Sequence, residues 1–178
     1  MMNAVEGIYY DDLFTFFPIV DITEFDTCTS TNSSKLLEQL VNHWKNDPVE
    51  RDLIHLFSGK NFVDPAIGRA IQPGLHDLSE AAYGVTQHVS EGGPTYYATL
   101  YGKTIIVAHE IGHNFNGTQV EAAFEERLGV GTFYTVMWPG YMGDEWMIAH
   151  FSNGQIGENP YKNNLAWMIP YAHDHLPD

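Results

Sequence analysis

The stretch Val107–Ala122, VAHEIGHNFNGTQVEA, contains two histidines four residues apart and a glutamate that directly follows the first of them. Residues four apart lie on one face of an α-helix, so His109 and His113 can each direct a ring nitrogen to the same ion. Glu110 projects to the neighbouring side, where it can hydrogen-bond a water molecule without binding the ion itself. The apolar run TIIVA before the motif is typical of a buried helix. The stretch therefore predicts a metal site and a general base on one buried helix.

The spacing of these three residues suits one kind of chemistry, the metal-assisted hydrolysis of a peptide bond. A zinc ion lowers the pKa of its bound water toward neutrality and polarises the carbonyl, while the glutamate moves the proton to the leaving amine. Residue usage makes a chance occurrence of HExxH an event on the order of one in a few hundred chains of this length. We therefore interpret His109 and His113 as zinc ligands and Glu110 as the general base.

The size and charge of the chain limit its organisation and its partners. Its 178 residues, 44% of them hydrophobic, suit one well-cored domain over 1–178. The formal net charge of −15, with only eight lysines and arginines, argues against binding to nucleic acid or to anionic membranes. No apolar run approaches the roughly 18 residues that a membrane-spanning helix requires. The single cysteine, Cys28, excludes an internal disulfide, and the first residues lack the basic and apolar regions of a signal peptide.

Before the motif, the pattern of apolar residues predicts a strand, a helix and three further strands. The run Leu13–Phe25 is rich in aromatic and β-branched residues and predicts an edge strand that contains Pro18. Asn32–Ser34 are capping candidates for an amphipathic helix that ends near Asp47. Three short apolar runs separated by Gly, Pro and Asp predict the further strands: DLIHLFSG, IGRAIQ and YGVTQHV.

From the motif onward, the sequence predicts two helices joined by irregular structure. The first is the buried helix over 98–115 that carries the histidines, and residues 129–143 are expected to form a loop because they are rich in Gly, Pro and aromatic side chains. A last short helix is expected over 163–169, closed by Pro170. Strands that alternate with helices before the motif favour an α/β fold.

The motif and several other segments resemble a known class of zinc proteases. HEIGHNFNGTQ resembles the extended metzincin motif HExxHxxGxxH, and YTVMWPGYMG is similar to the methionine turn that lies beneath the metal in that clan, with Met137 as the methionine. RDLIHLFSGKNF, AIGRAI and YGVTQHV, and later HFSNG and NNLAWMI, resemble segments of the adamalysin or reprolysin branch. The resemblance covers the chain from about Val5 to Ile169 and implies a zinc-dependent endopeptidase with Zn2+ as its cofactor.

The resemblance also implies a fold and a mode of substrate binding. The expected fold is an α/β, metzincin-like catalytic domain: a twisted mixed sheet with a buried active-site helix over about 1–116, and an irregular subdomain over about 117–178 that ends in a helix. A peptide or protein substrate would lie along an edge strand, and the residues after the methionine turn would form a wall of the specificity pocket. The candidate substrate-binding residues are therefore Ile67, Gly68, Ala70, Trp138, Pro139 and Tyr141. A secreted, monomeric protein is implied as well.

Two residues of the motif depart from the resembled pattern. Asn116 stands in place of a glycine that turns the chain sharply out of the helix, which requires a left-handed backbone conformation. Asparagine tolerates that conformation best after glycine, so we expect this change to be harmless. Gln119 stands where the third zinc ligand, usually a histidine, is expected. A neutral amide oxygen is a weaker zinc ligand than imidazole, so a lower metal affinity is expected.

Three arrangements of the third ligand position stay open. Gln119 contacts the metal, a water molecule takes its place, or Glu121, Glu125 or His150 replaces it, much as a downstream glutamate completes the site of gluzincins. If the site is incomplete, the alternative function is that of a pseudoprotease, which binds a peptide or a protein partner without cleaving it.

The amino end of the chain also departs from the resembled family. There, a further strand and most of a helix precede the segment that NAVEGIYYDDL resembles. We therefore expect a strand and part of a helix to be missing, as in a gene fragment, with the propeptide and any signal peptide further upstream. If the missing strand lies inside the sheet, its neighbours lose hydrogen-bond partners.

Overall fold

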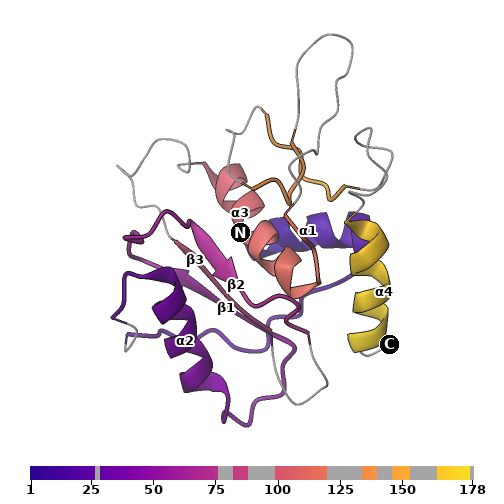
Figure 1. Ribbon diagram of the computed structural model, residues 1–178. Coiled ribbons are helices and arrows are strands. Elements are labelled where there is room, and N and C mark those ends of the chain that lie inside the picture. The colour runs from indigo at the N-terminus through magenta and orange to yellow at the C-terminus, as the bar shows by residue number, and fades with distance from the viewer. Residues whose placement is uncertain are drawn as a thin grey trace.

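Helices and strands are mixed along the chain in the computed structural model, which describes residues 1–26, 29–75, 82–87, 99–119, 134–139, 146–152 and 164–176. The helices are α1 (Met2–Leu13), α2 (Ser33–Trp44), α3 (Leu100–Asn114) and α4 (Leu165–His175) (Figure 1). The strands are β1 (Leu53–Ser58), β2 (Gly68–Ala70) and β3 (Ala82–Gln87). The predicted α/β class is thus confirmed as a mixture of four helices and three strands in this part of the chain. None of the helices described combines the length and the apolar composition that crossing a membrane requires.

The three strands form one mixed sheet in the order β1-β3-β2. β1 runs parallel to the central strand β3, with Leu53 opposite Ala82, and β2 runs antiparallel to β3, with Gly68 opposite Thr86. All residues of β3 except the last are buried, because this strand has a neighbour on each side. The three short strands predicted from the apolar runs are therefore confirmed.

Helices cover both faces of the sheet, and each face has its own apolar core. Successive side chains of a strand point to opposite faces. Tyr83 and Val85 of β3 accordingly join three leucines of α2 in one cluster. Ala82 of the same strand belongs to a second cluster, which is built from buried residues of α1, α3 and α4. Figure 1 shows the strands between α2 and α3, with α1 and α4 gathered around α3.

The amphipathic helix predicted from its leucines is confirmed as α2. Its N-cap is Asn32, as the capping candidates suggested, and the side chain of this residue accepts a hydrogen bond from the Lys35 amide at 3.1 Å. The helix ends at Trp44, slightly before the predicted end at Asp47. The guanidinium of Arg51 donates to the Trp44 carbonyl and lies 5.0 Å from the centre of its ring, which satisfies one terminal carbonyl of α2.

A local cap and several long-range hydrogen bonds fix α3, the helix that carries the motif. At its start, the Thr99 hydroxyl accepts a bond from the Gly102 amide at 3.0 Å. At its end, the buried Asn114 side chain donates to the carbonyls of Ile71 at 2.8 Å and Tyr83 at 3.1 Å. On the opposite side, the buried Tyr9 hydroxyl of α1 donates to the Ala108 carbonyl at 2.8 Å. The helix is therefore held at several points along its length.

The strand predicted over Leu13–Phe25 is wrong. Leu13 is the last residue of α1, and the described residues that follow it up to Asp26 form neither helix nor strand. Their apolar side chains remain largely exposed, with exposed fractions of 78% at Phe14 and 84% at Ile22. A high β-propensity forms a strand only where a partner strand and a buried face are present. No strand among the described residues pairs with this segment.

The predicted end of the last helix is also wrong, because α4 continues through Pro170 to His175. A proline inside a helix removes a backbone hydrogen bond and costs about 3 kcal/mol. Packing on both sides of Pro170 offsets this cost, since Met168 and Ala172 are buried in the core that α1 and α3 form. The Tyr171 hydroxyl also donates to the Leu75 carbonyl.

Candidate metal centre

α3 ends in a sharp turn that brings the following residues back along the helix. The amide of Asn116 donates to the His113 carbonyl at 3.0 Å, and the amide of Gly117 donates to the Gly112 carbonyl at 2.8 Å. These two bonds form a Schellman motif, which requires a left-handed residue between the helix and the outgoing chain. Asn116 has a φ of 66°, so the left-handed conformation predicted for it is confirmed.

The rings of His109 and His113 lie side by side on α3 and are oriented by backbone carbonyls. Nδ1 of His109 lies 2.7 Å from the Val136 carbonyl oxygen, and Nδ1 of His113 lies 2.9 Å from that of Gly117. A carbonyl only accepts, so each Nδ1 is the donor and each Nε2 keeps its lone pair. The ring centres are 4.8 Å apart and the planes are nearly perpendicular, at 89°. Two oriented Nε2 atoms on one helix face fit the requirements of a metal ion.

Both histidines are held in the neutral form that a metal requires. Burial and, to a lesser extent, the nearby His113 together lower the pKa of His109 to about 4, although the hydrogen bond to Val136 acts in the opposite direction. Burial also lowers the pKa of His113. A protonated imidazole cannot bind a metal, so pKa values below neutrality leave both lone pairs available at pH 7.

Glu110 lies on the same helix turn, directed toward β2. Its side chain is buried, with 5% of the residue exposed. Burial raises its pKa to about 8, although the charge of Arg69 lowers it. Its carboxylate packs against the backbone of Gly68, where a Cβ atom would lie only 2.4 Å from Oε1. A buried carboxylate whose pKa is near neutrality can act as a general base or acid.

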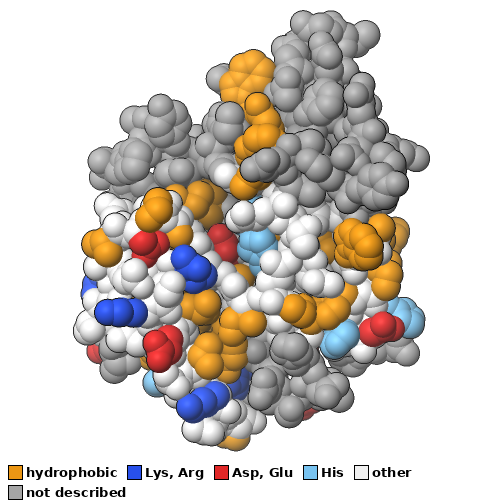
Figure 2. Space-filling model, viewed as in Figure 1, with side chains coloured by type: hydrophobic (Ala, Val, Ile, Leu, Met, Phe, Trp, Pro, Cys, Tyr) orange, Lys and Arg blue, Asp and Glu red, His pale blue; other side chains and the backbone are white. Residues whose placement is uncertain are grey.

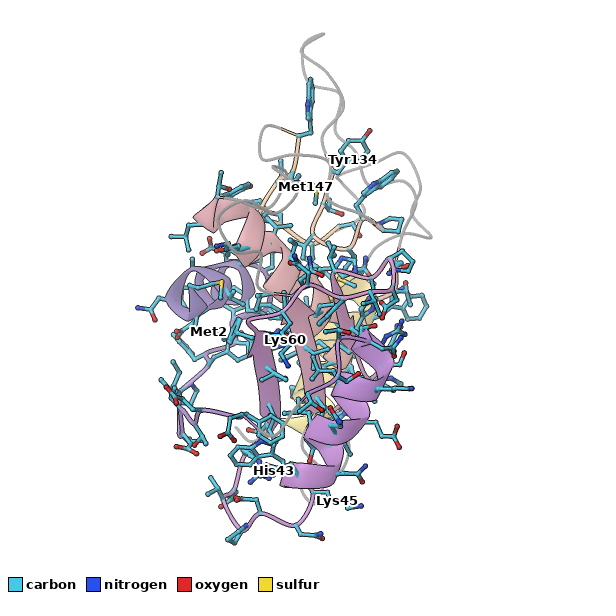
Figure 3. All side chains as sticks on the ribbon, turned by 90° about the vertical axis from the view of Figure 1, so that its left-hand side faces the viewer. Met2, His43, Lys45, Lys60, Tyr134 and Met147 are labelled. Atoms are coloured by element: carbon cyan, nitrogen blue, oxygen red, sulfur yellow. The ribbon has the colours of Figure 1, made fainter. Side chains whose placement is uncertain are left out.

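Met137 packs directly against α3 at Gly112. It is fully buried, and its Sδ would be 2.5 Å from a Cβ at Gly112, the residue just before His113. Phe151 would be 3.0 Å from the same Cβ, so only glycine fits at this position. The segment of Met137 is joined to residues 146–150 by a bridge between Tyr134 and Met147, which lie near each other above α3 in Figure 3.

A cavity of about 240 Å³ opens between β2, α3 and the segment of Met137. His109, Glu110 and Gln119 all line it. Four of the candidate substrate-binding residues also line it: Ile67, Gly68, Trp138 and Pro139. Ala70 follows on β2 but is not part of the lining, and Tyr141 lies outside the described residues. In Figure 2, a histidine and an acidic side chain lie close together near the middle of the face of the molecule that is shown.

Among the described residues, Gln119 is the candidate for the third ligand that lies at the cavity. Gln119 is exposed and lines the cavity together with His109. The ring of His150 instead lies 3.0 Å from Asp12 of α1, and Glu121 and Glu125 are outside the described residues. The described residues contain no cluster of three His, Cys, Asp or Glu side chains that could hold a metal. Among the described alternatives, Gln119 thus shares the cavity with His109, whereas His150 has a different partner.

Several supporting groups were missed from the sequence. The carbonyls of Val136 and Gly117 orient the histidines, and a backbone carbonyl carries no sequence signal. The Tyr9 hydroxyl bonds to the carbonyl just before His109, and the Asp12 carboxylate accepts a bond from the Phe151 amide at 2.7 Å. Both residues lie on α1, a segment that the sequence analysis aligned with the resembled family but to which it assigned no functional role. A tyrosine and an aspartate on one short helix give no signal by themselves.

Comparison with known proteins agrees with this geometry. The reprolysin model of metallo-peptidase family M12 matches residues 1–118. The matched region covers about two thirds of the chain, includes both histidines and Glu110, and ends one residue before Gln119. No curated protein matches the chain.

Proposed function

Because this chain belongs to metallo-peptidase family M12, we propose that it is a zinc-dependent endopeptidase of the metzincin class. The observation that supports this most is the arrangement on α3. Two neutral histidines present oriented Nε2 atoms beside a buried carboxylate, and His109, Glu110 and the edge strand β2 share one cavity. A purely structural role would not require polar groups at this depth, because burying them is costly.

His109 and His113 are the proposed ligands of Zn2+ through Nε2, with the side-chain oxygen of Gln119 as the third. Both imidazoles are neutral and are hydrogen-bonded at Nδ1, which is how most zinc-binding histidines are held. When bound, zinc activates a water molecule and polarises the scissile carbonyl. Met137 supports the site by filling the space beneath α3 next to Gly112.

Glu110 is the proposed general base. Its carboxylate takes a proton from the attacking water and then delivers it to the nitrogen of the leaving amine. Burial raises the pKa of Glu110 to about 8, so the carboxylate holds a proton more firmly than an exposed glutamate would. A group with such a pKa can both accept and return the proton near pH 7. The packing against Gly68 fixes where this exchange takes place.

The substrate is proposed to bind as an extended peptide along β2. β2 pairs with β3 on one side only, and no described strand occupies its other side. An exposed strand edge can hydrogen-bond a peptide backbone, which would place the peptide beside Glu110 in the cavity. Trp138 and Pro139 also line the cavity and are proposed to contact a substrate side chain. As the resemblance implies, we further propose a peptide or protein substrate, secretion and a monomeric state.

A pseudoprotease is the second candidate function, and Gln119 is the observation that favours it. An exposed neutral amide is a weak third ligand, and no His, Cys, Asp or Glu among the described residues joins the two histidines. Such a protein would bind peptides along β2 without cleaving them.

Zinc content and cleavage of casein by the wild type and Glu110→Gln separate these functions. The endopeptidase predicts about one zinc per chain and chelator-sensitive cleavage in the wild type. In Glu110→Gln it predicts retained zinc and no cleavage, because the amide cannot accept the proton. A folded wild type with neither zinc nor activity would support the pseudoprotease. Equal activity in both proteins would exclude Glu110 as the base.

A further inference from the structure

Asn164 stands at the N-cap of α4, but its side chain does not cap that helix. Asparagine is favoured at N-caps because its side-chain oxygen accepts a bond from an amide in the first helical turn. Here Oδ1 instead accepts a bond at 2.9 Å from the amide of Thr118, which is 46 residues earlier in the chain. Thr118 directly precedes Gln119. The side chain of Asn164 thus connects α4 to the segment that leads into the cavity.

Asn164 is itself held rigidly. Only 1% of the residue is exposed, and the same is true of its neighbour Ser152. The Ser152 hydroxyl oxygen accepts bonds from the backbone amide of Asn164 at 3.0 Å and from its Nδ2 at 3.3 Å. The next amide, of Leu165, donates to the Ser152 carbonyl at 3.1 Å. Both polar atoms of the Asn164 side chain are therefore engaged, and Oδ1 has a defined direction.

The residue before Thr118 is fixed as well. The amide of Gly117 bonds back to α3, and its carbonyl accepts bonds from Nε2 of Gln72 at 2.9 Å and from His113. A Cβ at Gly117 would lie 2.8 Å from the Gly112 carbonyl oxygen and 3.1 Å from Sδ of Met168 on α4. These hydrogen bonds and close contacts therefore restrict the backbone conformation at residues 117 and 118. Gln119 is the first side chain beyond it.

We propose that Asn164 is a positioning residue, which holds the backbone at Thr118 so that the Gln119 amide oxygen meets the ion bound by His109 and His113. This inference rests on the proposed zinc site with Gln119 as a ligand. A neutral amide oxygen binds zinc more weakly than an imidazole does. Its contribution to the binding free energy therefore depends more strongly on the side chain being held in position before the metal binds. α4, which is distant in sequence, then belongs to the support of the metal site.

The test is a zinc titration with a competing chelator on four proteins: the wild type, Asn164→Ala, Gln119→Ala and the double variant. Loss of a group that supports a metal ligand typically costs about 10-fold to 100-fold in affinity. We expect Asn164→Ala to weaken zinc binding about 10-fold in the wild-type background. In the Gln119→Ala background the same substitution should change the affinity less than about 2-fold, because no third ligand remains to be positioned.

Two further measurements separate positioning from a general loss of structure. Hydrogen exchange of the Thr118 amide should speed up in Asn164→Ala, while exchange of the α3 amides should stay unchanged. Asn164→Asp keeps an acceptor oxygen for Thr118 and should restore most of the affinity. If Asn164→Ala does not fold, Asn164→Ser is the substitute, because its shorter side chain cannot reach Thr118.

Each outcome of the titration has a defined meaning. An equal loss of affinity in both backgrounds, or no loss in Asn164→Ala while Gln119→Ala shows one, overturns the positioning role and leaves the proposed site intact. If Gln119→Ala binds zinc as tightly as the wild type, Gln119 is not a ligand, and the proposed ligand set fails together with this inference. If the wild type binds no zinc at all, the endopeptidase proposal itself fails.

Discussion

Gly68→Ala should displace the general base while leaving the metal site intact. The added Cβ would lie 2.4 Å from Oε1 of Glu110, 2.5 Å from its Cγ and 2.6 Å from its Cδ, whereas ordinary contacts begin at 3.4 Å. The whole end of the glutamate must therefore move by about 1 Å, and a displacement of that size can cost on the order of 100-fold in rate. The three atoms nearest to this Cβ all belong to Glu110, so we expect zinc affinity to be unchanged.

The assay is the kcat for a fluorogenic peptide, measured together with the zinc content of Gly68→Ala. Gly59→Ala is the matched control, because nothing lies within 4 Å of a Cβ at Gly59. We expect kcat to fall about 100-fold in the first variant and to stay near the wild-type value in the second. An unchanged kcat in Gly68→Ala would show that the position of Glu110 against β2 does not matter for the reaction.

Three further predictions concern the ligands and the sheet. His113→Ala should remove the zinc, and an unchanged zinc content by atomic absorption would place the site elsewhere. Gln119→His should raise zinc affinity about 10-fold to 100-fold and increase casein cleavage, because imidazole is the better ligand; equal values in both proteins would mean that position 119 makes no contact. Burial lowers the pKa of His55 to about 3, so only the unfolded chain takes up its proton between about pH 6.5 and pH 3. The free energy of unfolding, measured in urea with a chelator present, should therefore drop on acidification by on the order of a few kcal/mol more in the wild type than in His55→Gln. The same pH dependence in both proteins would contradict this.

The regular elements that could be predicted from the sequence are those whose signals are local. The leucines of α2 repeat with helical spacing, and Asn32 marks its start. The strands β1, β2 and β3 are short apolar runs bounded by Gly, Pro and Asp. Asn116 could be assigned a left-handed backbone because it stands in place of the glycine of the resembled motif and asparagine tolerates this conformation. In each case, the residues within a few positions decide the conformation.

The predictions that were wrong depend on partners distant in the chain. The aromatic and β-branched residues after Leu13 have the composition of a strand, but none of the described strands pairs with them. Pro170 was expected to end a helix, but burial of Met168 and Ala172 in the core of α1 and α3 outweighs its local cost. Local propensity is a weak prior wherever tertiary packing contributes more free energy.

The candidate site likewise combines features that follow from the local sequence with features that depend on distant parts of the chain. The i and i+4 spacing places His109 and His113 together without any knowledge of the rest of the chain. What turns the pair into an oriented site comes from elsewhere: a carbonyl 27 residues after His109, and a carbonyl beyond the left-handed turn for His113. In the proposed site, the third position depends on a contact still more distant, the bond between Asn164 and Thr118. The departure from the motif at Gln119 can therefore be noticed from the sequence alone, but in our proposal the placement of its amide depends on α4. The proposed binding of zinc through a glutamine therefore depends on tertiary packing as much as on the motif.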